Sequence, residues 1–297
     1  MSFTMRLKLT NKKIFHEDSH LIVTPDTQGA FQSFVYQKKV VDKHSGFQKI
    51  EVFETAVAGN VLVLDGVVQT TELDEFMYHE MLVHVPMFSI TAPVWDVLIV
   101  GGGDGGSLRE VLKHRSVRTV RLVDIDAEVI EIGRKYFGNG TSFDDPRVEI
   151  INADAADFIK KSDAMYDVAI IDCTDADTEG GKQLYNRQFM TALAKKMRIG
   201  GAVSMLSGVP VAQKLDHTNH LNEIMEFLGF RPYLYLTSLP SYYGGFTAIM
   251  LYMKGVNRAH PLRLNDGFDG KVKHYNAKLH EASFVLPNWI QEMLHGK

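Results

Sequence analysis

The sequence predicts an α/β protein whose parallel sheet ends in C-terminal antiparallel strands and is preceded by a small antiparallel β-domain. Two observations lead to this fold class. Residues 14–71 contain short β-rich runs separated by turn signals, whereas from residue 97 onward apolar runs alternate with helical stretches. Repeated β-α units imply parallel strands joined by right-handed crossovers. We therefore expect an N-terminal β-strand domain over residues 1–75 and an α/β domain over residues 76–297.

The first domain is expected to be built from hairpins. Its β-rich runs are residues 21–23, 31–41, 49–55, 61–64 and 67–69. Gly59-Asn60 and Asp65-Gly66 are two-residue turn signals between such runs. A helical spacing of apolar side chains begins at Glu72, so the junction between the domains is expected within residues 72–92.

The second domain is expected to alternate strands with helices. Strands are predicted at residues 97–100, 119–123, 148–151, 168–171 and 202–206, with helices such as 126–137 and 185–197. Residues 233–237 and 246–253 are expected to form a closing antiparallel pair. Because 45% of the 297 residues are hydrophobic, the chain can bury a substantial core.

A glycine-rich loop follows the first strand of the second domain. Residues 101–106 read Gly-Gly-Gly-Asp-Gly-Gly and lead into a helical stretch at 107–114. Glycines allow a ligand to lie against the backbone. In dinucleotide-binding loops the helix N-terminus holds a pyrophosphate, but Asp104 would repel an anion there. The loop therefore predicts a nucleoside ligand that carries a positive charge.

Aspartates follow four of the predicted parallel strands. They are Asp104, Asp124, Asp154, and Asp172 with Asp175. Ligands bind at the carboxyl ends of strands in open α/β sheets, so we expect these side chains in one crevice. Asp124, about 20 residues beyond the loop, has the position of a residue that accepts hydrogen bonds from a ribose diol, and Asp126 fits the following helix N-cap better. Asp154 can either accept from an adenine amine or cap a helix.

Asp172 and Asp175 lie three residues apart after a buried strand. Two carboxylates in that position can flank one small polyamine, and a carboxylate within hydrogen-bond reach can take the proton from an attacking ammonium. The alternative is a capped, solvated loop. The other acidic strand ends of the same crevice favour the amine site.

Composition and spacing exclude several other functions. The formal net charge of −4 supplies no basic field for nucleic acid, and the single Cys173 rules out an internal disulfide. His79 and His84 resemble a zinc motif, but their spacing of five turns them apart on a helix, so we predict no metal. With no apolar run of membrane-spanning length and no leader pattern, we expect a cytoplasmic protein without a membrane partner.

Several motifs together resemble the polyamine aminopropyltransferases, the spermidine synthase family. The matching stretches are residues 15–17, 64–71, 74–81, 101–110, 123–126, 172–175, 240–245, 275–276 and 284–287, with His280. The resemblance runs from about residue 14 to residue 290, and the combination of motifs is highly specific.

The resemblance implies a Rossmann-like, methyltransferase-type catalytic domain and a homodimer. It also implies transfer of the aminopropyl group of decarboxylated S-adenosylmethionine, a co-substrate and not a cofactor, to putrescine. The products would be spermidine and methylthioadenosine. The implied donor-binding residues are Gln48, Gly101, Gly102, Asp104, Asp124, Asp154, Ala155 and Asp172. The implied acceptor-binding residues are Gln69, Tyr78, His79, Asp172, Asp175, Tyr242 and Tyr243. Asp172 would be the catalytic base, with Tyr78 orienting the nitrogen.

Two departures from the family pattern concern the acceptor. After Asp175 the family usually continues with Pro, a variable residue and Gly-Pro, whereas residues 176–181 read Ala-Asp-Thr-Glu-Gly-Gly. Leu206 stands where the family tends to have a glutamine. These differences leave open a longer or differently spaced polyamine, or reduced activity. The alternatives are an S-adenosylmethionine-dependent amine N-methyltransferase and a low-activity regulatory paralogue; a scaffold would have no need of all five aspartates.

Overall fold

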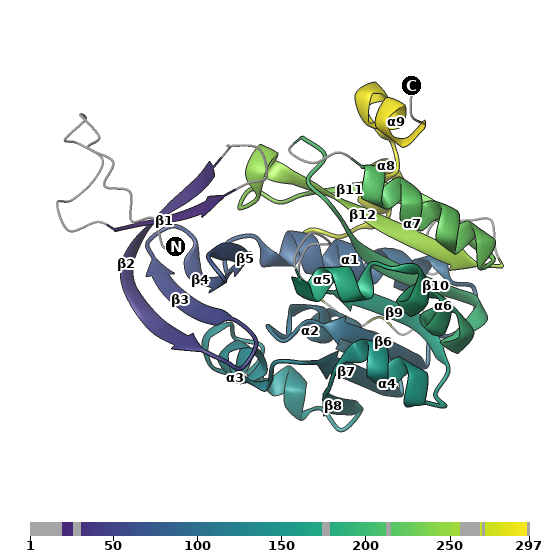
Figure 1. Cartoon of the computed structure of the whole chain (residues 1–297), viewed down its shortest axis with the longest axis horizontal. Coiled ribbons are helices and arrows are strands. Elements are labelled where there is room, and N and C mark those ends of the chain that lie inside the picture. Colours follow the sequence, from purple (N-terminus) through teal and green to yellow (C-terminus); the bar gives the residue numbers. More distant parts are fainter. Residues whose placement is uncertain are drawn as a thin grey trace. The chain divides into compact units, whose positions relative to one another are not determined.

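The structure is a computed structural model that divides into two compact units, Met1–Asp74 and Glu75–Lys297 (Figure 1). It describes residues 20–25, 31–173, 179–211, 215–255, 268 and 271–295. None of the helices within these ranges combines the length and the apolar character needed to cross a lipid bilayer.

The first unit is a five-stranded antiparallel sheet, as predicted. Its strands pair in chain order, β1-β2-β3-β4-β5. They are β1 (His20–Pro25), β2 (Phe31–His44), β3 (Lys49–Thr55), β4 (Gly59–Leu64) and β5 (Val67–Thr71). Alternate side chains of neighbouring strands, including Phe53, Val61, Val63 and Val68, form its apolar cluster.

One of the two predicted hairpin turns is correct and the other is wrong. Asp65 and Gly66 connect β4 to β5, and both have the positive φ angles (48° and 84°) that a tight two-residue hairpin turn requires. Gly59-Asn60 instead begins β4, with Gly59 opposite Thr55. The turn there is residues 56–58, closed by Thr55 Oγ1, which accepts from the Ala58 N–H at 2.8 Å. The hydrogen bond to Thr55 Oγ1 therefore stabilises a turn that begins three residues before the predicted position at Gly59.

The second unit contains the predicted α/β sheet. Its helices are α1 (Glu75–Ser89), α2 (Gly106–Leu112), α3 (Ala127–Tyr136), α4 (Ala155–Lys161), α5 (Glu179–Leu184), α6 (Arg187–Lys196), α7 (Asp216–Phe227), α8 (Ala277–Ser283) and α9 (Asn288–His295), with short 3-10 turns η1 (Gly140–Asp144) and η2 (Tyr243–Gly245). Its strands are β6 (Asp96–Gly101), β7 (Thr119–Asp124), β8 (Val148–Asn152), β9 (Tyr166–Asp172), β10 (Met197–Gly208), β11 (Phe230–Ser238) and β12 (Phe246–Lys254).

The strand order of this sheet is β11-β12-β10-β9-β6-β7-β8. Strands β6 to β10 are parallel, and β12 pairs antiparallel with both β10 and β11, which confirms the predicted closing pair. The chain runs from β6 outward through β7 and β8 and then crosses back to β9 on the other side of β6. This reversal is the topological switch point, where ligands bind in such sheets.

Both faces of the sheet are buried, which explains why its strands read as continuous apolar runs. On β6, Val97 and Ile99 pack in the cluster that contains α1 and α2, whereas Leu98 and Val100 pack in the cluster that contains α4, α6 and α7. Strand β6 is thereby packed between two layers of helices, and the glycine loop begins at its carboxyl end.

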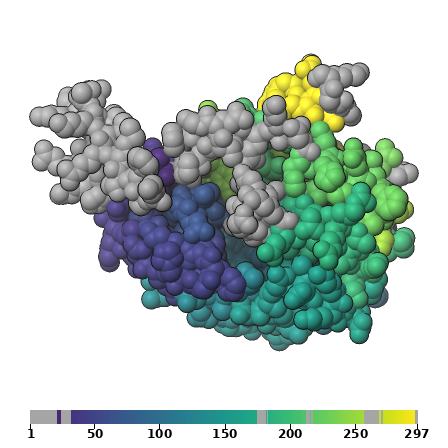
Figure 2. Space-filling view, viewed as in Figure 1, coloured from purple at the N-terminus to yellow at the C-terminus, as the bar shows by residue number. Residues whose placement is uncertain are grey.

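The C-terminal segment is tied to α1 by one buried carboxylate. Glu80 accepts hydrogen bonds from the backbone N–H groups of Lys273, His274 and Tyr275, each at 2.7 Å. Because three donors replace its hydration, the Glu80 carboxylate is stable although it is only 1% exposed. The segment continues into α8 and α9, and Figure 2 shows α9, in yellow, on the surface of this unit.

Candidate active site

The carboxyl ends of β6 and β9 meet at the first two loop glycines. The Gly102 N–H donates to the backbone oxygen of Asp172 at 2.7 Å. A Cβ at Gly101 would collide with that same backbone oxygen, and both glycines have positive φ angles (77° and 71°). Glycine is required here because the loop crosses directly against the end of β9.

His79 of α1 lies among three carboxylates. Its Nδ1 is 2.7 Å from Glu75 Oε2, and its Nε2 is 3.4 Å from Asp104 Oδ2 and 3.8 Å from Asp172 Oδ2. The ring also packs against the start of α2, where a Cβ at Gly106 would overlap it. Burial by itself lowers the pKa of His79, but Asp104, Glu75 and Asp172 outweigh burial and raise this pKa to about 10.

Asp172 lies at the end of β9 with 11% of its side chain exposed and is hydrogen-bonded by two hydroxyl groups. Ser107 Oγ of α2 donates to its Oδ2 at 2.6 Å, and the Tyr78 phenol also donates to this carboxylate. Burial, followed by the charge of Asp104, raises the pKa of Asp172, and His79, Ser107 and Tyr78 oppose that rise. A carboxyl group with this balance can exchange a proton with a bound amine.

Tyr78 connects Asp172 to the aromatic side of the site. Burial and the neighbouring Asp172 charge raise its pKa well above the usual range, so its phenol remains a hydrogen-bond donor. Tyr242 and Tyr185 are close enough to act electrostatically on Tyr78. Tyr243 of η2 is 39% exposed, so Tyr242 is the tyrosine of this pair that approaches Tyr78.

Asp124 ends β7 beside the glycine loop. Its Oδ1 accepts from the Asp126 N–H at 2.9 Å, and a Cβ at Gly103 would meet its Oδ2 at 2.8 Å. Burial raises the pKa of Asp124 to about 6. The prediction that Asp126 caps the following helix is confirmed, because Asp126 Oδ1 accepts from the Glu128 N–H at the start of α3.

Asp154 adopts the helix-cap geometry that was one of its two predicted uses. Its Oδ1 accepts from the N–H groups of Ala156 and Asp157, at 2.7 and 3.1 Å, and Ala155 is the first residue of α4. Both hydrogen bonds use Oδ1, so the geometry is compatible with Oδ2 accepting a further hydrogen bond. Contact of Asp154 with adenine stays a prediction.

The other predicted residues stay predictions. Gln48 and Gln69 belong to the first unit, where the Gln48 N–H donates to Ser45 Oγ and Gln69 Nε2 donates to the Val67 carbonyl. Asp175 and residues 176–178 lie outside the described residues, and α5 begins at Glu179. Leu206 is buried within β10 opposite Ile249.

Sequence reasoning missed Glu75, Ser107 and Arg109. Arg109 Nη1 and Nη2 donate to the two oxygens of Glu75 at 2.9 Å each, and Glu75 in turn accepts from His79. The spacing of four residues between Glu75 and His79 was a usable signal, because such residues share one helix face. Ser107 gave no comparable signal, since its partner Asp172 is 65 residues away.

His79, Asp104 and Asp172 also satisfy a distance condition for a metal site, because one ligand atom from each lies within 4.8 Å of the others. A histidine that donates from both ring nitrogens has no lone pair left for a metal. As arranged, the two carboxylates suit an organic cation, and the absence of a metal stays a prediction.

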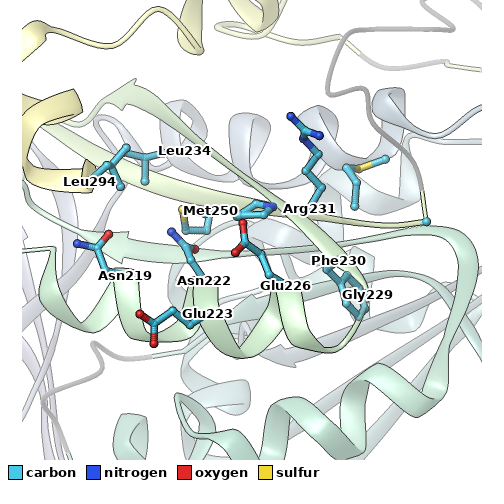
Figure 3. A pocket seen from close by; sticks show the side chains of 13 residues that line it. Asn219, Asn222, Glu223, Glu226, Gly229, Phe230, Arg231, Leu234, Met250 and Leu294 are labelled. Carbon is cyan, nitrogen blue, oxygen red and sulfur yellow. The ribbon is translucent and has the colours of Figure 1, made fainter. Parts of the chain in front are cut away.

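A separate pocket of about 800 Å³ lies beside α7 and β11 (Figure 3). Asn219, Asn222, Glu223 and Glu226 project toward it from one helix, and Leu294 of α9 closes another side. Among the described residues, the predicted site residues are absent from the lining of this pocket, so it is distinct from the cluster at the strand ends.

Known proteins resemble this chain over nearly its whole length. The family described as "Spermine/spermidine synthase domain" matches residues 75–260, and "Spermidine synthase tetramerisation domain" matches residues 22–72. The polyamine aminopropyltransferase of Thermotoga maritima is 39% identical, with 84% of this chain and 85% of the relative covered. The one from Escherichia fergusonii is 34% identical, with 96% and 98% covered.

Two solved structures share the fold. A spermidine synthase in complex with the transition-state analogue AdoDATO has a TM-score of 0.87 at 33% identity, covering 98% of this chain and 100% of that one. The spermidine synthase from Thermotoga maritima has a TM-score of 0.83 at 32% identity, covering 98% and 99%. The predicted fold class and the family resemblance are thereby confirmed. The chain belongs to the spermidine synthase family and is an aminopropyltransferase of that family.

Proposed function

We propose that this enzyme transfers the aminopropyl group of decarboxylated S-adenosylmethionine to putrescine, producing spermidine and methylthioadenosine. The observation that carries the proposal is the pair of carboxylates, Asp104 and Asp172, that meet at His79 beside the glycine loop. The similar spermidine synthase that binds AdoDATO supports the same pair of substrates. Partly buried carboxylates at this position suit a donor that keeps a sulfonium and an amine but has lost its carboxylate.

The donor is proposed to lie along the strand ends. Asp124 would accept from the ribose hydroxyls, and Asp104 would pair with the donor amine. Asp154 and Ala155 would contact the adenine at the start of α4. Gly101 and Gly102 permit close approach to the backbone. Gln48 of the first unit is proposed to complete this subsite.

The reaction we propose is a direct displacement. The acceptor ammonium first gives a proton to Asp172, and the neutral nitrogen then attacks the carbon beside the sulfonium. A C–N bond forms as the C–S bond breaks, the sulfur keeps the bonding electrons, and methylthioadenosine leaves. Tyr78, which donates to Asp172, is placed to orient the nitrogen. Holding the two substrates in attack geometry can supply on the order of 7 kcal/mol of the barrier in favourable cases.

The acceptor subsite is proposed to contain Gln69, Tyr78, His79, Asp172, Asp175, Tyr242 and Tyr243. Of these, Tyr78, His79, Asp172 and Tyr242 come from one unit and interact with one another as described above. Putrescine is the proposed acceptor, and the departures at residues 176–181 and at Leu206 make its length preference the first property to measure.

We also propose that the chain self-associates through its first unit, in the cytoplasm. The support is the match of residues 22–72 to a domain described as a tetramerisation domain. Light scattering after size-exclusion chromatography of the full chain would measure the assembly. A dimer or a tetramer supports the proposal, and a monomer at micromolar concentration contradicts it.

The decisive test combines a substrate panel with one substitution. The purified chain is given the decarboxylated donor with putrescine, cadaverine, diaminopropane or spermidine, and products are identified by mass. Asp172→Asn should lower kcat by about 10²-fold to 10⁴-fold, as expected when a general base is removed, while calorimetry shows the donor still bound. Asp144→Asn, which removes an exposed partner of Arg134, is the matched control.

Three results would contradict the proposal. Substantial turnover by Asp172→Asn would exclude Asp172 as the base. Tighter binding of carboxylated S-adenosylmethionine than of the decarboxylated donor would favour N-methyl transfer. Failure of the wild-type chain with every amine would favour a regulatory paralogue.

A further inference from the structure

We infer that His79 is a permanent imidazolium in the working enzyme, and that Glu75 and Arg109 are positioning residues that keep it charged. The effect on turnover rests on the proposed function, whereas the charge state of His79 stands on the geometry alone.

The surroundings of the ring favour a proton on each of its nitrogens. Nδ1 faces Glu75 at 2.7 Å, and Nε2 faces Asp104 at 3.4 Å and Asp172 at 3.8 Å. An ionised carboxylate can only accept a hydrogen bond. A neutral imidazole has one bare lone pair, which would point at a negative oxygen in either tautomer. Protons on both nitrogens satisfy all of these contacts.

Glu75 is itself held as an anion by Arg109. The guanidinium donates to both Glu75 oxygens in a two-pronged arrangement, at 2.9 Å each. Burial alone would raise the pKa of Glu75, but His79 and Arg109 outweigh it and lower this pKa to about 2. Arg109 is anchored by Asn139 Oδ1 at 2.9 Å and by Glu110 Oε1 at 2.7 Å. The pair therefore presents a fixed negative charge to Nδ1.

The described groups that face the ring come from every element packed around it. They are Glu75 from α1, Asp104 from the loop after β6 and Asp172 from β9. Tyr78 lies edge-on, with its ring centroid 5.3 Å away, and remains a neutral phenol. Helix α2 contributes the backbone of Gly106, and its Arg109 bonds to Glu75 and not to the ring. The charges around the ring are thus negative.

This fixed positive charge has two consequences for the proposed reaction. It counteracts the burial that raises the pKa of Asp172 and so favours the ionised form of the base. It also lowers the pKa of an ammonium held by Asp172, so the acceptor nitrogen is more easily made neutral for attack. A neutral His79 would provide neither effect.

The charge state can be measured without any assay of activity. The full chain is labelled with ¹³C and ¹⁵N at histidine, and the imidazole signals are followed from pH 6 to pH 10. The His79 signal is identified by its loss in His79→Asn. We expect an imidazolium signature through pH 8 in the wild type and a His79 pKa about 1 to 3 units lower in Glu75→Gln, as for loss of a close opposite charge.

Two further variants keep the test sharp. Arg109→Lys retains a positive charge but loses the two-pronged contact, so we expect a smaller drop of the His79 pKa in the same direction. Glu149→Gln removes a carboxylate that pairs with Arg121 on β7 and should leave both the His79 signal and kcat unchanged. In turnover, Glu75→Gln should lower kcat about 10-fold, change KM less, and move the acidic limb of the kcat profile to higher pH.

Each outcome bears on the inference. A neutral His79 at pH 7.5 in the wild type would overturn the inferred charge state. An unchanged His79 pKa in both Glu75→Gln and Arg109→Lys would overturn the role of that pair. An intact imidazolium in a chain that transfers no aminopropyl group would contradict the proposed function while supporting the charge state.

Discussion

The two halves of α1 carry buried histidines whose pKa values are shifted in opposite directions. At the N-terminal half, His79 has carboxylates on both nitrogens and a pKa raised to about 10. At the C-terminal half, burial lowers the pKa of His84, with Glu110 opposing the shift. One proton on the His84 ring suffices: Nε2 donates to Glu110 at 2.9 Å, and Nδ1 accepts from His114 Nε2 at 3.0 Å.

The difference shows that the partners of a buried histidine decide whether its pKa rises or falls. Both histidines are almost fully buried, with 3% of His79 and none of His84 exposed. His84 shares the Glu110 carboxylate with Arg109 and Lys113 and is also in contact with the rings of Phe88, Phe268 and Tyr275. This half of α1 is therefore core, whereas the half with His79 borders the proposed active site.

The largest expected loss of unfolding free energy comes from Glu110, which links the two halves of α1. Glu110 of α2 is fully buried and accepts from His84, Arg109 and Lys113. Glu110→Gln leaves these donors with an uncharged partner, and we expect a loss of about 3 kcal/mol in the free energy of unfolding. Urea denaturation followed by circular dichroism measures it. A loss below 1 kcal/mol would show that the two halves are not coupled through this carboxylate.

The next effect separates the site half from the core half. Gly106→Ala places a methyl group on the His79 ring and not on His84. Overpacking of this kind costs about 1 to 3 kcal/mol, and the displaced ring should lose its contacts with Asp104 and Asp172. We expect Gly106→Ala to lower both kcat and the free energy of unfolding. Normal kcat in the alanine variant would show that the position of His79 does not matter for turnover.

The pH dependence of stability should have opposite signs for the two histidines. The folded-state pKa of His79 is raised, so its contribution to stability is present below about pH 6.5 and is lost as pH rises toward 10. The folded-state pKa of His84 is lowered, as is that of His114, so their contribution is present above about pH 6.5 and is lost as pH falls.

Variants can assign each limb of that profile. His79→Asn should flatten the decline of the unfolding free energy between pH 6.5 and 10, and His84→Asn should flatten the decline below pH 6.5. Chemical denaturation across this range provides the measurement. The comparison fails if both variants change the same limb.

The smallest effect is expected at an ion pair away from both histidines. Glu149 pairs with Arg121 across β7 and β8 at 2.8 Å and is mostly exposed. Glu149→Gln should change the free energy of unfolding by less than about 1 kcal/mol, because water and salt screen such pairs. A loss of unfolding free energy as large as that of Glu110→Gln would mean that burial does not explain the different contributions of Glu110 and Glu149 to stability.

The sequence by itself determined the architecture and the chemical character of the site. Apolar strands alternating with helices predicted the parallel sheet, and the Asp65-Gly66 turn was correct because its geometry depends only on adjacent residues. The grouping of the glycine loop with the aspartates at strand ends was also predictable, since the carboxyl ends of parallel strands lie at one edge of a sheet. Asp104 and Asp172 accordingly both lie within 4 Å of His79 Nε2, at 3.4 and 3.8 Å.

Only the tertiary structure decided how those groups are charged and held. The turn predicted at Gly59-Asn60 was moved by a hydrogen bond to Thr55, and Ser107 reaches Asp172 across 65 residues. The proton on each nitrogen of His79 depends on oxygens from α1, the glycine loop and β9 at once. Protonation depends on distances of a few ångströms between segments far apart in the chain. The pattern of residues along one segment does not predict these distances.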